Sequence, residues 1–269
     1  MPIATAPELD ARTQQARRIT RQASKLALQF FEAPERLEAQ LKGHQDWVTK
    51  ADRAVEAFVQ EQLQQSFPGE GFLGEETGQS GSNDAVWVCD PIDGTQNFMR
   101  GIPTFGITLA FVSQGRTLVG VTEEPAFGRT YSARRGGGAF LDDTRLHIRP
   151  DCTMNKAVLG LGYNANRDPE EFLKYLARLF ELGTEFRRIG SAAICLAYVA
   201  SGKLDAFWQM HLKSWDVISG LLLVQEAGGL ACDFLAQDGL TTGNPVLAGA
   251  PGVICQLSEA LDIPIIGGA

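Results

Sequence analysis

Oxygen-bearing groups are closely spaced in the run Asp90-Pro-Ile-Asp93-Gly-Thr95. The proline fixes one backbone dihedral, which helps to aim both carboxylates and the Ile92 carbonyl at one point. Hard oxygen donors of this kind suit Mg²⁺ rather than zinc. Gly94 permits a close approach of the backbone to a ligand, and a helix beginning at Thr95 would offer free N–H groups to an anion. The run predicts a metal and phosphate site, although Asp-Pro and Asp-Gly are also ordinary turn sequences.

Two further acidic residues, Glu75 and Asp216, fall at the ends of expected elements, as Asp90 and Asp93 do. Carboxylates at strand-to-loop junctions can converge outside a sheet, where α/β proteins usually place their sites. The three histidines lack metal-ligand spacing, and the five scattered cysteines include no C-x-x-C pair. A structural zinc site and a disulfide framework are therefore not expected.

The composition limits the class of protein. The 269 residues carry a net charge of −8, and 44% of them are hydrophobic and 21% charged. These are globular values, and the acidic balance argues against a nucleic-acid scaffold, which needs a basic face. No apolar run approaches the ~18 residues of a membrane span, and the N-terminus lacks a signal-peptide pattern. We expect a cytoplasmic protein without membrane association, in which a bound metal supplies the positive field for a phosphate.

Hydrophobic periodicity predicts helices and strands that would position these residues. Amphipathic helices are expected over 7–31 and 52–66, with a polar-edged turn over 46–49 between them. Strands are expected over 85–89, 105–112, 117–122, 130–134, 139–141 and 158–161. Further helices are expected over 169–181, 192–201 and 215–227. The first of these three is expected to turn Phe172, Leu173, Leu176 and Phe180 inward. This order predicts two α/β halves with a seam near 142–156.

Several short motifs follow one another over about 180 residues. They are Asp46-Trp-Val-Thr49 with Asp52, Gly74-Glu-Glu-Thr77, the segment 87–98, Gly190-Ser-Ala-Ala193, and Ser214-Trp-Asp-Val217 with Glu226-Ala-Gly-Gly229. Together they closely resemble the inositol monophosphatase family, whose two signature stretches surround D-P-I-D-G-T and W-D-x-x-x-G. The resemblance extends from the first helix to about residue 250.

The resemblance implies an α/β (α+β) fold, a layered αβαβα sandwich of the inositol monophosphatase and fructose-1,6-bisphosphatase type. It implies a homodimer that hydrolyses small-molecule phosphomonoesters with Mg²⁺, two to three ions in all, and that lithium inhibits. Residues 1–269 would form a single catalytic domain. Its half over 1–145 would carry the metal site, and its half over 146–269 would contribute Asp216 and the substrate pocket.

The resemblance also assigns roles to individual residues. The metal ligands would be Glu75, Asp90, the Ile92 carbonyl, Asp93 and Asp216. Glu75 and Thr95 would hold the attacking water, and Asp46 would hold Thr95, whereas Asp52 is expected to cap the helix that begins there. Phosphate and substrate contacts would come from Asp93, Gly94, Thr95, Gly190, Ser191, Ala192, Gln209 and Asp216. For Lys42, a role in metal or phosphate binding and a place on the solvated surface remain equal alternatives, and Glu76 is almost as evenly divided between a place beside the metal ligands and solvent exposure.

The sequence departs from the family pattern in the leaving-group pocket. Inositol-specific members have a Glu followed two residues later by a Gly, where this chain has Gln209 and His211. An amide can hydrogen-bond a hydroxyl but cannot attract an ammonium group. We therefore expect a phosphatase for a small polyol or sugar phosphate. Histidinol phosphate, a fructose bisphosphate and a 3′-phosphoadenosine nucleotide are alternative substrates, and a non-catalytic binding module is a further alternative.

Overall fold

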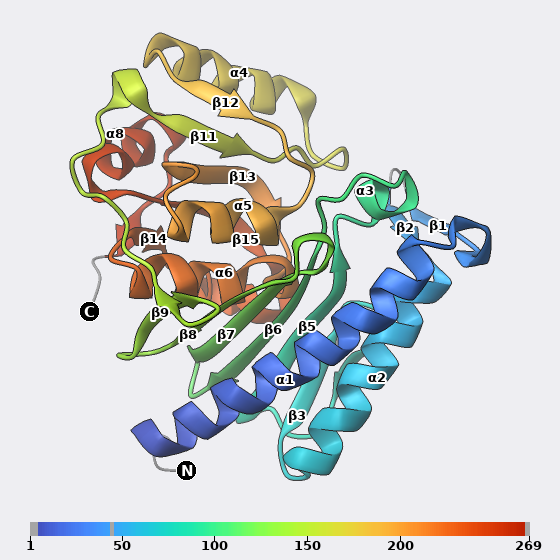
Figure 1. Ribbon diagram of the computed structural model, residues 1–269. Helices are drawn as coiled ribbons and strands as arrows, with labels where there is room; N and C mark the ends of the chain where they lie inside the picture. Colours follow the sequence, from blue (N-terminus) through green and yellow to red (C-terminus); the bar gives the residue numbers. More distant parts are fainter. Residues whose placement is uncertain (1–4, 44–45, 267–269) are drawn as a thin grey trace.

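Two long helices form one outer layer in the computed structural model, which describes residues 5–43 and 46–266. These are α1 (Ala6–Phe31) and α2 (Lys50–Ser66), and they pack side by side against the first sheet (Figure 1). Thr49 begins α2 as a capping box, because its hydroxyl accepts the Ala51 N–H while Asp52 accepts the Thr49 N–H. The cap fixes the end of α2 that lies nearest the candidate site.

The first sheet has eight strands in the order β10-β9-β8-β7-β6-β5-β3-β4. Its neighbours are antiparallel except for the parallel pair β3 and β5. The bounds are β3 Gly71–Gly74, β4 Gly78–Ser80, β5 Ala85–Asp93, β6 Gly106–Ser113, β7 Arg116–Glu124, β8 Arg129–Arg134, β9 Gly138–Leu141 and β10 Thr144–Arg145. Since β3 and β5 run in parallel, the residues that follow them emerge at the same edge of the sheet.

Two apolar helices form the middle layer between the sheets. These are α5 (Ala192–Ala200) and α6 (Ser214–Glu226), and most of their residues are buried because a sheet covers each side. Close packing depends on glycine at one position: a Cβ on Gly220 would lie 2.5 Å from the Leu196 Cβ. Because both helices lie between the sheets, their first residues are at the seam where the two sheets meet.

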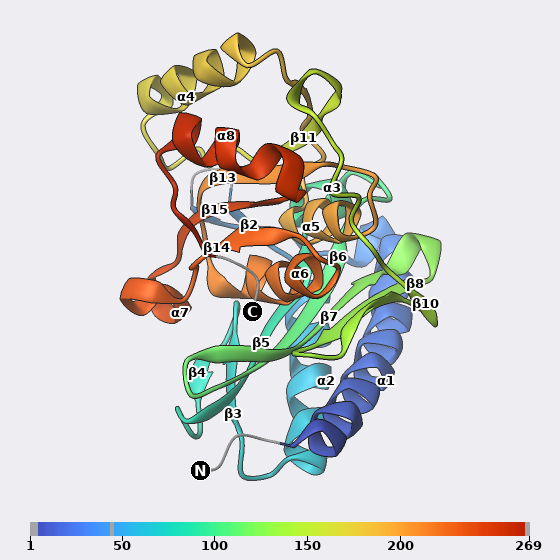
Figure 2. The same cartoon turned by 90° about the vertical axis from the view of Figure 1, so that its left-hand side faces the viewer.

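The second sheet has six strands in the order β12-β11-β13-β15-β14-β16, and α4 and α8 cover its outer face (Figure 2). The bounds are β11 Val158–Leu161, α4 Pro169–Glu181, β12 Glu185–Arg187, β13 Ala206–Leu212, β14 Leu230–Cys232, β15 Asn244–Gly249, α8 Pro251–Leu261 and β16 Ile265–Ile266. The layers alternate helix, sheet, helix, sheet, helix. This is the predicted αβαβα sandwich.

Short elements complete the chain and lie mostly at the layer edges. The hairpin of β1 (Gln40–Gly43) and β2 (Asp46–Val48) replaces the turn expected at 46–49. The helices are α3 (Thr95–Met99) and α7 (Gly239–Thr242), with 3₁₀ turns at Pro34–Arg36, Pro125–Phe127, Met154–Lys156 and Ala236–Asp238. Within the described residues, no helix combines the length and apolar character that a bilayer crossing requires.

One predicted helix face is wrong. In α4, the side chains of Leu173 and Phe180 are 59% and 56% exposed rather than turned inward. Phe172 and Leu176 do pack on the core, and Leu179 is fully buried. Because α4 is an outer-layer helix, the sheet and α8 cover only one narrow stripe of it, and its remaining apolar side chains face outward.

Candidate active site

Three aspartates meet at the seam between the sheets. Asp90 and Asp93 come from the end of β5 and Asp216 from the first turn of α6, and one ligand oxygen of each lies within 4.8 Å of those of the others. In each residue, a carboxylate oxygen accepts a backbone N–H, from Ile92 (2.9 Å), Ala193 (2.7 Å) and Lys213 (2.9 Å) respectively. These backbone hydrogen bonds occupy one oxygen of each aspartate and fix its orientation.

The charges of this aspartate cluster oppose one another. Burial, followed by the neighbouring carboxylates, raises the pKa of Asp90 and of Asp216 well above the ordinary value. Burial also raises the pKa of Asp93 to about 6, although the Ser191 hydroxyl and the Ala193 N–H lower it. Like charges gathered in a buried site disfavour ionisation unless a cation joins them. The cluster is therefore a receptor for a proton or a cation.

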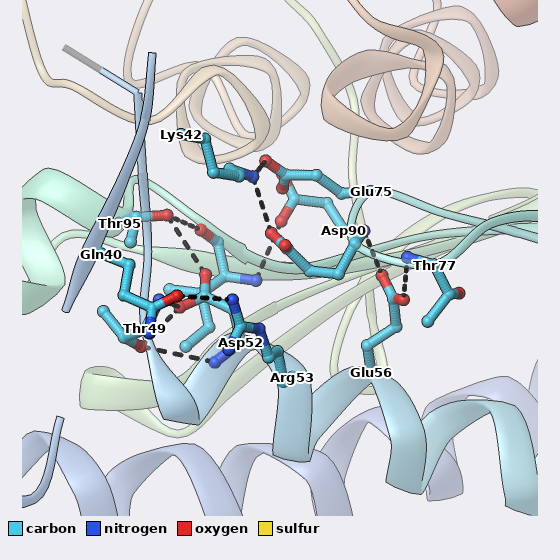
Figure 3. A network of polar contacts seen from close by, with 12 residues as sticks. Gln40, Lys42, Thr49, Asp52, Arg53, Glu56, Glu75, Thr77, Asp90 and Thr95 are labelled. Carbon is cyan, nitrogen blue, oxygen red and sulfur yellow. Dashed lines mark hydrogen bonds and ion pairs between the residues drawn. The ribbon is translucent and has the colours of Figure 1, made fainter. Parts of the chain in front are cut away.

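Glu75 lies beside this cluster, directly after β3. Burial raises the pKa of Glu75 to about 7, although Lys42 opposes the shift. The Lys42 ammonium on β1 donates to Glu75 at 3.0 Å and to Glu76 at 2.8 Å (Figure 3). Burial lowers the pKa of Lys42, but the two carboxylates outweigh it and raise that pKa overall. Of the two alternatives for Lys42, the structure supports a place at the site, and the Glu76 side chain is only 8% exposed.

Thr95 is the first residue of α3, and its hydroxyl lies between two acceptors. Its hydroxyl is 3.0 Å from the Ile92 carbonyl oxygen and 3.3 Å from Asp52 Oδ1, and its single proton serves one of them at a time. Asp52 therefore both caps α2 and contacts Thr95, and the role of Asp46 stays a prediction. The Asp46 side chain lies outside the described residues.

Asp52 is fully buried at the start of α2, and burial raises its pKa to about 6. The Thr49 hydroxyl and N–H both donate to its other oxygen, Oδ2, which lowers the pKa in part. The cap thus holds Oδ2 and leaves Oδ1 turned toward Thr95. A carboxyl with a pKa near 6 can receive a proton from the hydroxyl of Thr95 or return one at neutral pH.

Gly94 allows the two halves of the chain to touch at the site. Its φ of 95° lies in the left-handed region, and a Cβ there would lie 3.1 Å from the Gly190 carbonyl oxygen. Asn97 reinforces the contact, because its amide donates to the Thr104 and Ile189 carbonyls at 2.8 and 2.9 Å. The segment carrying Gly190 and Ser191 is thereby pressed onto the end of β5.

A cavity of about 260 Å³ opens over these groups. Its lining includes nine of the predicted site residues, namely Glu75, Asp93, Gly94, Thr95, Gly190, Ser191, Ala192, Gln209 and Asp216. Asp90 and Ile92 lie behind the wall, where the first joins the aspartate cluster and the second presents its carbonyl to Thr95. Glu75 and Asp216, which are 141 positions apart in the sequence, thus face one small space.

Gln209 is held tightly at the far side of the cavity. Its side chain is 8% exposed, and its amide donates to the His211 carbonyl oxygen at 3.3 Å. Its carbonyl end lies against Gly162, where a Cβ would come within 1.6 Å of Oε1. Gly162 is therefore required for this placement of Gln209.

The sequence interpretation did not single out Glu56 and Arg188. Glu56 is a fully buried carboxylate on α2, four residues after Asp52, and that spacing was the available signal. Arg188 also lines the cavity, two residues before Gly190. Its neighbour Arg187 instead pairs with Glu185. The sequence alone offered no way to choose between these two adjacent arginines.

The donors fit a divalent cation that prefers oxygen ligands. The converging groups are carboxylates, whereas the part of the chain that the structure describes brings no histidine or cysteine into the aspartate cluster. Hard, anionic oxygen ligands are those of Mg²⁺. The mutual repulsion described above is what such an ion would relieve.

Comparisons with known proteins agree with this arrangement. The chain matches the inositol monophosphatase family over residues 8–263. An inositol-1-monophosphatase of Rhizobium meliloti (strain 1021) is 40% identical over 255 residues, which cover 90% of this chain and 93% of that protein. The Nus factor SuhB of Escherichia coli (strain K12) is 37% identical over 242 residues, which cover 88% and 90%. The crystal structure of extragenic suppressor protein suhB from Bartonella henselae has a TM-score of 0.86 at 31% identity, covering 93% of this chain and 98% of that one.

A layered sandwich with buried carboxylates at the seam of its sheets defines the class of protein, a phosphoric monoester hydrolase. The chain belongs to the inositol monophosphatase family. The predicted family, fold class and enzyme class are confirmed.

Proposed function

We propose that this protein is a Mg²⁺-dependent phosphatase that hydrolyses the phosphomonoester of a small polyol or sugar, such as an inositol 1-phosphate, by attack of water. The observation that carries the proposal is the aspartate cluster with Glu75 beside it, at the floor of the cavity. Glu75, Asp90, the Ile92 carbonyl, Asp93 and Asp216 would hold two to three ions. When bound, Mg²⁺ supplies Lewis-acid chemistry and lowers the pKa of water.

The protein's own groups would hold and deprotonate the attacking water. Glu75 and Thr95 both line the cavity, and Asp52 is placed to accept the proton that the Thr95 hydroxyl gives up. We propose Asp52 for the role first predicted for Asp46. The backbone of Gly94 and Thr95, together with Ser191, would bind the phosphate oxygens.

The leaving group would lie against Gln209. Its amide and the neighbouring Gly190 and Ala192 segment offer neutral hydrogen-bonding groups, which suit hydroxyls better than an ammonium. This supports a neutral polyol or sugar over histidinol phosphate. The chain would act as one catalytic domain, and the cytoplasmic location, the homodimer and lithium inhibition remain predictions.

A substrate with a second anionic group is the second candidate, and Arg188 favours it. Arg188 is exposed at the cavity wall, and among the described residues its guanidinium has no ion-pair partner. A free guanidinium is well suited to a second phosphate. A fructose bisphosphate and a 3′-phosphoadenosine nucleotide both carry one. The name of the Escherichia coli relative, a Nus factor, keeps a binding role as a further alternative.

The test is phosphate release at neutral pH with Mg²⁺ from inositol 1-phosphate, histidinol phosphate, fructose 1,6-bisphosphate and 3′-phosphoadenosine 5′-phosphate. We expect the highest kcat/KM for inositol 1-phosphate and a reduced rate in lithium. An Arg188→Ala variant should leave that substrate almost unaffected if the first candidate holds. Preference for a bisphosphate that Arg188→Ala removes would favour the second candidate, and no release from any substrate would contradict both.

A further inference from the structure

Glu56 is a buried carboxylate placed directly beneath the segment that carries Glu75. Its side chain is fully buried. It extends from α2 toward Thr77 (Figure 3). Oε2 accepts the Glu76 N–H at 2.9 Å and Oε1 accepts the Thr77 N–H at 2.8 Å. Among the described residues no cation pairs with Glu56. Both of its oxygens are therefore committed to the backbone that follows Glu75.

The contacts of Glu56 are specific and do more than fill space in the core. A carboxylate taken out of water is costly unless hydrogen bonds replace its hydration, and the two N–H donors do so. Gly74 precedes Glu75 and presents no side chain, because a Cβ there would lie 2.5 Å from the Glu56 carboxylate. The chain thus passes over Glu56 in contact from Gly74 to Thr77, with Glu75 in the middle.

The same helix also fixes the other side of the site. Asp52 precedes Glu56 by four residues on α2, so the two carboxylates lie on one face. Asp52 contacts Thr95, and Glu56 accepts the backbone N–H groups of Glu76 and Thr77. Because one rigid helix carries both contacts, the distance between the Thr95 hydroxyl and the Glu75 segment is set by one helical turn.

We propose that Glu56 is a positioning residue, which aims Glu75 at the aspartate cluster by anchoring the backbone that follows it. It touches neither substrate nor ion and acts through Glu75. The inference rests on the proposed function, since it concerns the residue that would hold both metal and water. It assigns to α2 a catalytic alignment that its place in the outer layer does not suggest.

Glu56→Gln tests the proposal with little change in volume. An amide offers one acceptor oxygen, and its NH₂ group would face the N–H of Glu76 or Thr77. We expect kcat to fall roughly 10–100-fold and Mg²⁺ affinity, measured by calorimetry without substrate, to weaken by a similar factor. KM should change less than kcat. Glu61→Gln is the matched control, because Glu61 is exposed on the same helix and, among the described residues, bonds only to Gln65.

Two further variants keep the test decisive if Glu56→Gln folds poorly. Gly74→Ala pushes on the carboxylate from the other side and should weaken Mg²⁺ affinity in the same direction. Glu56→Asp keeps two acceptor oxygens on a shorter stem and should recover part of the loss. Wild-type kcat and Mg²⁺ affinity in both Glu56→Gln and Gly74→Ala would overturn the proposal. An inactive wild type would instead overturn the proposed function.

Discussion

Buried carboxylates occur in two regions of this molecule, and they are neutralised in different ways. In the aspartate cluster, acids from β5 and α6 face one another across the seam. At the far end of β7, the Glu124 carboxylate accepts from the Tyr198 hydroxyl at 2.6 Å, the Tyr131 hydroxyl at 3.2 Å and Arg129 at 3.4 Å. The Glu124 network, consisting of Glu124, Arg129, Tyr131, Tyr198 and Lys203, thus supplies its own donors.

The difference separates a functional acid cluster from a structural one. Burial and like charges raise the pKa of Asp90 and Asp216, whereas Glu124 is surrounded by donors and by the cation of Arg129. A buried carboxylate whose oxygens are already hydrogen-bonded has few positions left for a ligand, whereas a cation relieves the repulsion among carboxylates that face one another. Burial alone therefore does not mark a site, and the partners do.

Asp93→Asn should have the largest effect on activity because it removes a negative charge from the aspartate cluster. We expect kcat to fall roughly 10²–10³-fold or more, the loss typical of one preorganised electrostatic group. Mg²⁺ at 100 times its dissociation constant should stabilise the wild type against unfolding by about 2.7 kcal/mol. That stabilisation should be much smaller in the variant. Thermal melts with Mg²⁺ and with chelator measure it.

An Asp93→Asn protein that keeps both its activity and its stabilisation by Mg²⁺ would end the distinction between the two regions. The metal-free melt serves as the control. Ser191 and Ala193 can still donate to the Asn side-chain oxygen, so the metal-free variant should unfold close to the wild type.

Glu124→Gln should have the next largest effect, and on stability rather than catalysis. An amide presents one acceptor oxygen where Tyr131, Tyr198 and Arg129 now share two, and its NH₂ can donate only to a tyrosine hydroxyl that turns its own proton away. We expect a loss of roughly 2–3 kcal/mol in the free energy of unfolding, measured in urea, because buried donors are left unpaired. Mg²⁺ affinity should not change. A stability loss with weakened Mg²⁺ binding would mean that the two regions are coupled.

Substitution of Glu123, the residue before Glu124, should have a smaller effect. It should raise the free energy of unfolding, whereas Glu124→Gln should lower it. Burial raises the pKa of Glu123 from 4.5 to about 7, with Thr130, Arg21 and Arg17 lowering it and Asp142 raising it, and its Oε2 has no hydrogen-bond partner among the described residues. The folded state therefore favours the protonated form. We therefore expect the contribution of Glu123 to stability to be greatest below pH 4.5, to fall as the pH rises to 7, and to stay low above that.

Glu123→Gln removes this dependence on pH. The variant should gain about 1–2 kcal/mol over the wild type at pH 8, below the ~3 kcal/mol that the full pKa shift would give, and almost nothing near pH 5. Melting temperatures compared from pH 5 to pH 8 measure the gain. A constant difference between the two proteins at all pH values would show that the ionisation of Glu123 is not its cause.

The sequence predicted most of the fold and the members of the site, but not their exact partners. Strong periodicity located α1 and α2 within two residues at each end, and α4 at both ends. It could not distinguish the covered stripe of α4 from its exposed Leu173, because apolar residues occupy both. The strand β13 and the strands after residue 227 were not predicted.

Partner choice within the site depends on tertiary contacts that a linear pattern does not contain. Asp46 and Asp52 flank the same cap, and only the docking of α2 against β5 brings Asp52 to Thr95. The capping pattern also concealed the contact of Asp52 with Thr95, since the Asp52 side chain satisfies that pattern completely. A residue with a sufficient local explanation can still carry a second function through its other oxygen.

Because the site lies at the seam between the sheets, activity requires that both halves of the chain are assembled. Asp93 from one side is held by Ser191 and Ala193 from the other, and Asp216 completes the cluster. The connection between the last strand of the first sheet and the first strand of the second carries only one 3₁₀ turn, Met154–Lys156. A chain divided there would yield two fragments, neither holding the whole set of carboxylates. Phosphate release by a mixture of the two fragments would then measure their association, as in a split-enzyme assay.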